Sequence, residues 1–196
     1  MVSVATEGAI DTAVARRICN EVELEVAAAH GERGKQRLDQ SLDGYNAAAR
    51  HGSWFVLRDL DTDADCAPSL RERLLATPAR GMTFRIAVHE IESWLIADHI
   101  SFARYFSVSM GLVTRDPESI PHPKDHLVNL VRRSRSRRIR EDVVPRDRSG
   151  VRIGPGYTSR MIDFIWSMWS PARASVRSDS LRRCMHRLSR TPPATK

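Results

Sequence analysis

Cysteines and long apolar runs are scarce in this sequence. Its three cysteines, Cys19, Cys66 and Cys184, are odd in number and widely spaced, so they form neither a metal-binding pair nor a disulfide framework. No apolar stretch approaches the roughly 20 residues that a membrane-spanning helix needs, and the N-terminus lacks the basic and apolar segments of a signal peptide. We therefore expect a cytoplasmic protein without a membrane partner.

Two ligand-binding loop motifs are also absent. The stretch around Gly31, Gly34 and Lys35 lacks the full spacing of a phosphate-binding P-loop, so it is either an exposed polar loop or a minor phosphate contact. A calcium-binding EF-hand loop counted from Asp61 would require glycine where Cys66 stands. Nucleotide binding by a P-loop and calcium binding by an EF-hand are thus excluded.

The two halves of the chain carry opposite charge. The 196 residues have a formal net charge of +7, with 41% hydrophobic and 28% charged residues, as is ordinary for a globular protein. Residues 1–100 contain 11 Lys and Arg against 16 Asp and Glu, whereas residues 101–196 contain 20 against 8. This asymmetry indicates either a metal site beside a surface for a polyanion or two halves that neutralise each other.

An apolar run that ends in a row of carboxylates is the main functional signal. Trp54 to Leu57 is typical of a buried strand, and Asp59, Asp61, Asp63 and Asp65 follow it at alternate positions. In parallel sheets the ligand binds at the carboxyl ends of the strands. Crowded carboxylates there need a cation, contact with water or protonation. Mg²⁺, which prefers oxygen ligands, is the interpretation that we favour for Asp59 and Asp61, whereas Asp63 and Asp65 fit a solvated turn equally well.

Acidic residues also follow two further strand-like runs. Glu7 comes after the short run at residues 2–5 and before a helical pattern, where it is either a site residue or an acid that favours the helix dipole. Glu90 and Glu92 come after the run at residues 82–88. Parallel strands would deliver all three groups of acids to one edge of a sheet, which strengthens the metal hypothesis.

The second half of the chain is basic and mainly helical in pattern. Apolar residues at helical spacing precede a dense run of arginines, and charged runs of this kind either bind phosphate or form a solvated helix surface. Further helical patterns occur at residues 161–169 and 181–188, and residues 191–196 have the composition of a disordered tail. The predicted nucleic-acid-binding residues are Lys124, Arg132, Arg133, Arg135, Arg137, Arg138 and Arg140.

Several stretches together resemble a known family. Glu7-Gly8 and the Asp59-x-Asp61-x-Asp63 pattern resemble the TOPRIM domain of topoisomerases, primases and overcoming-lysogenization-type nucleases. The stretches LRDLDTDADCAPSL, RIAVHEIESWLIAD and HPKDHLVNL, the GPGY turn and SDSLRR are similar to an uncharacterised bacterial TOPRIM-like family across nearly the whole chain. Ala64 replaces the glycine of the topoisomerase motif, so topoisomerase activity is not expected.

The resemblance implies specific roles. Glu7 would act as acid–base group or ligand, and the Asp59 and Asp61 carboxylates would bind Mg²⁺ or Mn²⁺, with Asp63, Glu90 and Glu92 as additional ligands. It implies an α/β fold with a TOPRIM-like parallel sheet over residues 1–105 and a helical, basic extension over residues 106–190 packed on it. It also implies an ATPase partner in a phage-defence-type system.

Two functions follow from this pattern. The first is a magnesium-dependent nuclease, a hydrolase of phosphodiester bonds in nucleic acid. The second is a non-catalytic TOPRIM-like module that docks on an ATPase or binds nucleic acid without cutting it.

Overall fold

The computed structural model describes residues 1–191, which form two compact units. The first unit contains residues 1–88 together with the chain from residue 180 onward, and the second contains residues 89–179. This division does not coincide with the boundary expected at residue 105. Residues 192–196, most of the tail expected to be disordered, lie outside the described residues.

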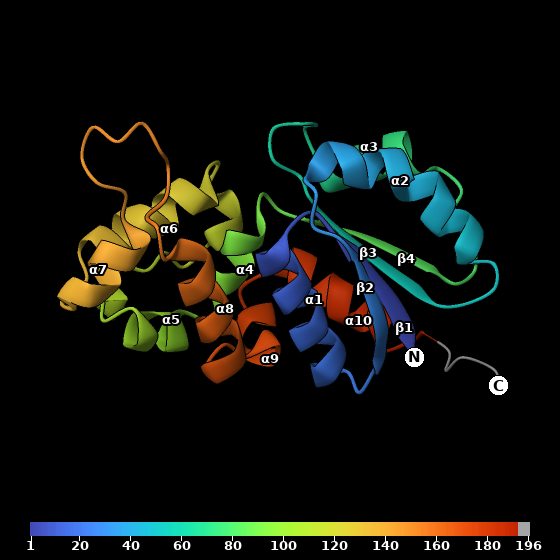
Figure 1. Ribbon diagram of the computed structural model, residues 1–196. Coiled ribbons are helices and arrows are strands. Elements are labelled where there is room, and N and C mark those ends of the chain that lie inside the picture. The colour runs from blue at the N-terminus through green and yellow to red at the C-terminus, as the bar shows by residue number, and fades with distance from the viewer. Residues whose placement is uncertain (192–196) are drawn as a thin grey trace. The chain divides into compact units, whose positions relative to one another are not determined.

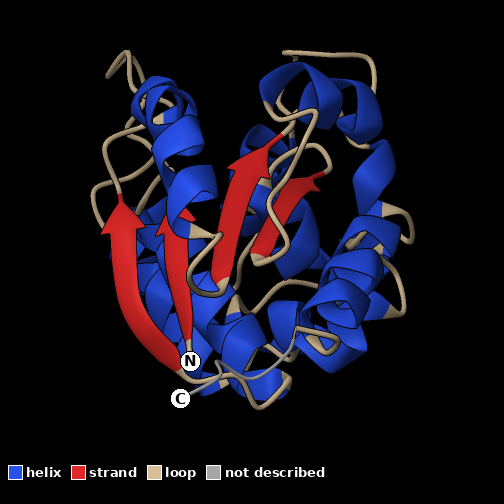
Figure 2. Ribbon diagram, turned by 90° about the vertical axis from the view of Figure 1, so that its right-hand side faces the viewer, coloured by secondary structure: helices blue, strands red, loops and turns tan. Residues whose placement is uncertain are grey.

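The first unit is built on a four-stranded parallel sheet. Its strands are β1 (Val2–Thr6), β2 (Val26–Gly31), β3 (Trp54–Asp59) and β4 (Met82–Ala87), in the order β2-β1-β3-β4. The four arrows in Figure 2 point the same way. The α/β prediction is confirmed, and the arrangement is consistent with a TOPRIM-like fold. The helices of this unit are α1 (Ala9–Glu21), α2 (Lys35–Ala48), α3 (Ala67–Leu74) and, near the C-terminus, α10 (Asp179–Leu188).

Both faces of this sheet are covered, as parallel sheets require. Alternate strand residues, such as Ala5, Val56 and Phe84, form a core cluster with Leu38 and Leu70 of α2 and α3. Their neighbours along the strands, for example Val4 and Phe55, are equally buried on the opposite face. Figure 1 shows α2 and α3 on one side of the sheet and α1 and α10 on the other.

Strand β2 was not predicted from the sequence. It reads VAAAHG and lies at an edge of the sheet, with side chains that are partly buried or exposed. Alanine favours helix over strand, and the segment contains no run of large apolar residues. The sequence therefore carries no strong signal for β2, although it predicts the other three strands.

The second unit is helical, as the sequence predicts for most of its length. Its core contains the buried aromatic side chains of Trp94, Phe102, Phe106 and Phe164, and the Trp169 indole donates a hydrogen bond to the Trp94 carbonyl at 3.0 Å. Within residues 1–191, no helix has the length and apolar character needed to cross a membrane. The helices are α4 (Ile91–Ala97), α5 (His99–Tyr105), α6 (Pro123–Arg132), α7 (Arg137–Val143), α8 (Tyr157–Ser167) and α9 (Pro171–Ser175), with 3₁₀ turns at Met110–Leu112 and Pro117–Ser119.

Candidate functional site

The ends of β1 and β3 bring two predicted acids into contact. Strands β1 and β3 pair in parallel with Ala5 opposite Val56, so both chains leave the sheet at the same edge. There the Glu7 carboxylate accepts a hydrogen bond from the Asp59 backbone N–H, with Oε1 and N 2.8 Å apart. The structure thus places Glu7 beside the carboxylate-bearing turn that follows β3.

A buried guanidinium lies at the centre of the acids. The Arg58 side chain is only 3% exposed, and its nitrogens lie 3.5 Å from a Glu7 oxygen, 3.8 Å from Asp61 and 2.6 Å from Asp63. It also donates two hydrogen bonds to the Asp39 carboxylate of α2, at 3.3 and 3.1 Å, and one to the Asp59 carbonyl. Arg58 therefore serves as the counter-ion of this cluster.

Lys35 supplies a second positive charge. Its ammonium group donates hydrogen bonds to Asp61 at 2.8 Å and to both oxygens of Asp63 at 3.1 Å. The lysine is the first residue of α2, directly after the loop that follows β2. That loop is held against the end of β1, because the Gly34 N–H donates to the Glu7 carbonyl and the Glu32 N–H to the Thr6 carbonyl.

The pKa values reflect this arrangement. Burial raises the pKa of Glu7, although the Asp59 N–H and Arg58 counteract it. Burial alone would raise the pKa of Asp63, but its hydrogen bonds to Arg58 and Lys35 outweigh that effect and lower it. Burial alone would lower the pKa of Arg58, yet Asp39 and Asp63 together raise it. Arg58 thus stays charged, and Asp63 is stabilised as a carboxylate.

The chemistry of this donor set fits a hard cation, because several carboxylates face one cationic group. That group is the guanidinium of Arg58, so a metal ion would have to displace it from Glu7 and Asp61. As the side chains stand, no group of three or more His, Cys, Asp or Glu residues within the described residues is arranged to hold a metal ion. The magnesium site therefore stays a prediction.

Glu90 and Glu92 have partners inside the second unit. The Glu90 carboxylate accepts a hydrogen bond from the Lys124 backbone N–H at 2.7 Å. Glu92, only 1% exposed, accepts one from the Tyr157 hydroxyl at 2.8 Å and lies 3.5 Å from the Lys124 ammonium. These contacts connect α4 with α6 and α8, which gives both acids a role in the packing of this unit.

Some arginines of the Arg132–Arg140 run form hydrogen bonds or ion pairs within the described residues, and others do not. Arg132 lies 4.0 Å from Asp147, Arg137 pairs with Glu141 at 2.8 Å, and Arg140 donates to the Ser134 carbonyl. The side chains of Arg133, Arg135 and Arg138 are exposed and make no hydrogen bond or ion pair with any described residue. These three guanidinium groups are the ones available to a phosphate backbone.

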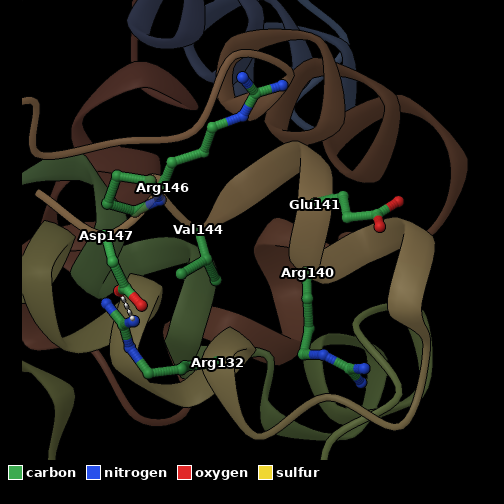
Figure 3. Close-up of a pocket in the computed structure, with 7 residues that line it drawn as sticks. Arg132, Arg140, Glu141, Val144, Arg146 and Asp147 are labelled. Carbon is green, nitrogen blue, oxygen red and sulfur yellow. Dashed lines mark ion pairs between the residues drawn. The ribbon is translucent and has the colours of Figure 1, made fainter. Parts of the chain in front are cut away.

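The same unit contains a hollow of about 680 Å³ beside this run (Figure 3). Arg132, Arg140 and Arg146 line it, together with Glu141 and Asp147. In Figure 3 the guanidinium groups of Arg140 and Arg146 point in different directions, and Arg132 faces Asp147. The hollow therefore lacks the converging cations of a phosphate pocket.

Glu7, Asp39, Asp59, Asp61 and Asp63, together with Arg58 and Lys35, are here called the acidic cluster. Three of these residues were not identified as site residues from the sequence. Asp39 lies on α2, and its place beside Arg58 depends on how that helix packs on the sheet, for which the sequence carries no signal. Lys35 was interpreted as a loop residue because β2 was not predicted. Arg58 did have a signal, since a charged residue in a buried apolar run requires a partner.

Comparisons of the chain with protein-family models, with curated proteins and with solved structures find no match. The TOPRIM resemblance consequently stays a prediction from the sequence.

Proposed function

We propose that the protein is a metal-dependent phosphodiesterase that acts on nucleic acid at the carboxyl edge of the parallel sheet. The observation that supports it is the meeting of three acidic residues at the ends of β1 and β3. The Glu7 and Asp61 carboxylates lie beside the Arg58 guanidinium, and the Asp59 backbone N–H donates to Glu7. Parallel sheets bind their ligands at this edge. Carboxylates gathered around a cation there are what a magnesium-dependent site needs.

Each side chain has a distinct part in this proposal. Glu7, Asp59 and Asp61 would hold the cation, which when bound polarises a phosphate oxygen and activates water. Glu7 is suited to move a proton, because burial raises its pKa above the usual value of a carboxyl group. Once displaced from the carboxylates, Arg58 and Lys35 are positioned to hold phosphate oxygens. In the second unit, Arg133, Arg135 and Arg138 bind the substrate backbone.

A cleavage assay tests this proposal. The wild-type protein should cut single- or double-stranded DNA or RNA when Mg²⁺ or Mn²⁺ is added, and EDTA should stop the reaction. Glu7→Gln and Asp59→Asn should lose at least about a hundredfold in rate while still binding the nucleic acid, since a general acid–base group alone contributes that much. Cleavage that persists in both variants would contradict the assignment.

A second function, a module that binds without cutting, is favoured by one observation. Arg58 is almost fully buried and ion-paired with four acidic residues, so the cluster already has a counter-ion without a metal. In this case the wild-type protein would cut nothing with any divalent metal. The family resemblance suggests an ATPase partner under both functions, so the assay is run with and without a candidate ATPase. Cleavage that requires the ATPase and Asp59 supports the enzyme.

A further inference from the structure

Two adjoining hollows in the first unit are lined by arginines that the proposed nuclease site does not use. One, of about 320 Å³, is lined by Arg80, Gly81, Thr83, Arg187, Arg190 and Thr191. The other, of about 160 Å³, lies along the edge strand β4 and is lined by Arg71, Leu75, Pro78, Met82, Thr83, Phe84, Arg85 and Arg187. Thr83 and Arg187 line both hollows, so the two adjoin, and together they are here called the β4 groove.

Within residues 1–191, the arginines that line the β4 groove have no acidic partner. No carboxylate among the described residues forms an ion pair with Arg71, Arg80, Arg85, Arg187 or Arg190. No acidic side chain lines either hollow. This contrasts with Arg58 in the same unit, which is surrounded by carboxylates. Positive charge in the groove is therefore uncompensated by the described part of the chain.

At Arg85 the lack of an acidic partner within the described residues destabilises the folded protein, because part of this side chain is buried. Its Nε is buried and has no hydrogen-bond partner among the described residues. Burial lowers the pKa of its guanidinium, Cys184 partly counteracts this, and repulsion from Arg71, Arg183 and Arg187 lowers the pKa further. A buried donor without an acceptor destabilises the protein, and a buried charge without a counter-ion does so more strongly. An anion in the groove would remove both penalties.

We propose that the β4 groove binds phosphate groups. Arginine is suited to this because its planar fork donates two hydrogen bonds to a phosphate. Five arginines spread over two hollows are more than one phosphate needs, so the ligand carries at least two, either as a free polyphosphate or along a nucleic-acid backbone. This site lies on different residues from the acidic cluster and from the Arg132–Arg140 run, so it stands independently of the proposed nuclease.

Thermal melting with pyrophosphate tests the site on the whole protein. In phosphate-free buffer, pyrophosphate should raise the Tm of the wild type by binding the folded state. The exposed pair Arg187→Gln and Arg190→Gln should weaken binding about tenfold, which corresponds to the loss of one charge-assisted hydrogen bond. Arg50→Gln removes an exposed arginine from the same unit outside the groove and should leave the Tm shift intact.

A second variant distinguishes a loss of pyrophosphate binding from a loss of stability. Arg85→Met removes the buried charge, so in phosphate-free buffer its Tm should equal or exceed that of the wild type, while its response to pyrophosphate should be lost. Equal pyrophosphate shifts in the wild type, in Arg85→Met and in the exposed double variant would overturn the proposal. A wild-type protein that responds to neither pyrophosphate nor an oligonucleotide would also overturn it.

An oligothymidylate distinguishes the two phosphate sources. It is titrated against a protein that carries Arg133→Gln, Arg135→Gln and Arg138→Gln, so that the other arginine run does not contribute. If Arg187→Gln and Arg190→Gln then weaken both pyrophosphate and the oligonucleotide, the groove binds a nucleic-acid backbone. If they weaken pyrophosphate alone, the groove binds a free polyphosphate.

Discussion

At the scale of single residues, Arg58 determines the chemistry of the acidic cluster. Crowded carboxylates need a cation, and in this protein a side chain from the strand itself supplies it. Removing one member of a buried ion-pair network leaves the other charges without a counter-ion. This destabilises the protein more than replacing the whole network by apolar residues does. The stability of the first unit should therefore depend strongly on this one guanidinium.

Replacing Arg58 by Gln should lower the free energy of unfolding by about 3–5 kcal/mol in metal-free buffer, because Glu7, Asp39 and Asp63 lose their shared counter-ion. Urea denaturation with EDTA measures this. Arg58→Lys is the control, since it keeps the charge but loses the forked contact with Asp39. It should therefore be destabilised less than Arg58→Gln.

The same variant tests the predicted metal. With Arg58 gone, Mg²⁺ should bind the vacated carboxylates and raise the Tm of Arg58→Gln more than that of the wild type, by mass action on the folded state. Thermal melts over a magnesium titration give the two shifts. An Arg58→Gln protein that does not respond to Mg²⁺ would argue that these carboxylates are not a metal site.

At the scale of secondary-structure elements, the turn from β2 into α2 positions Lys35 beside the acids. Gly31 ends β2 with a φ of +99°, and a Cβ added there would lie 2.1 Å from the Thr6 carbonyl oxygen of β1. Thr6 immediately precedes Glu7. The close approach of β2 to β1 at this point therefore requires glycine.

Gly31→Ala should destabilise the protein by about 3 kcal/mol or more, because it combines a strained backbone with a clash against main-chain atoms. Gly34→Ala is a matched control. Its φ is also positive, at +84°, but nothing lies within 4 Å of an added Cβ, so only the conformational strain of about 1–3 kcal/mol applies. Urea denaturation curves compare the two. Equal losses of stability in the two variants would show that the contact between Gly31 and the Thr6 carbonyl does not add to the cost of an alanine there.

At the scale of the whole molecule, charge is separated along the chain. Carboxylates collect at one edge of the sheet, while the longest arginine run lies in the helical unit. The arginines in that run without partners among the described residues are Arg133, Arg135 and Arg138. Backbone binding by these residues should be electrostatic, indifferent to sequence and sensitive to salt.

Replacing Arg133, Arg135 and Arg138 by Gln should weaken binding to duplex DNA and reduce the slope of log K against log salt by about 2–3, since each lost phosphate contact contributes about 0.9. Fluorescence anisotropy over a salt series gives the slope. Arg50, Arg104 and Arg115, all exposed, provide a charge-matched control triple. If this control triple reduces the slope equally, the effect comes from net charge rather than from the arginine run.

The sequence by itself determined where the chain is buried and where its charges lie. Strands β1, β3 and β4 form short apolar runs because both of their faces are covered, so these strands and the acids that follow them were predictable. Strand β4 is buried in this way although it lies at an edge of the sheet. Helical spacing likewise predicted α1, α4, α6 and α10. Strand β2 was not predictable, because its side chains are only partly buried and its alanines do not favour a strand.

Only the tertiary structure decided which groups neutralise one another. A carboxylate pattern in sequence predicts the need for a cation but not its identity, because that depends on which side chain folding delivers to the same place. Here Arg58, Lys35 and Asp39 come from three positions that only strand order and helix packing bring together. The same packing left Arg71, Arg85 and Arg187 without an ion pair to an acid among the described residues, a distribution of charge that no local pattern encodes.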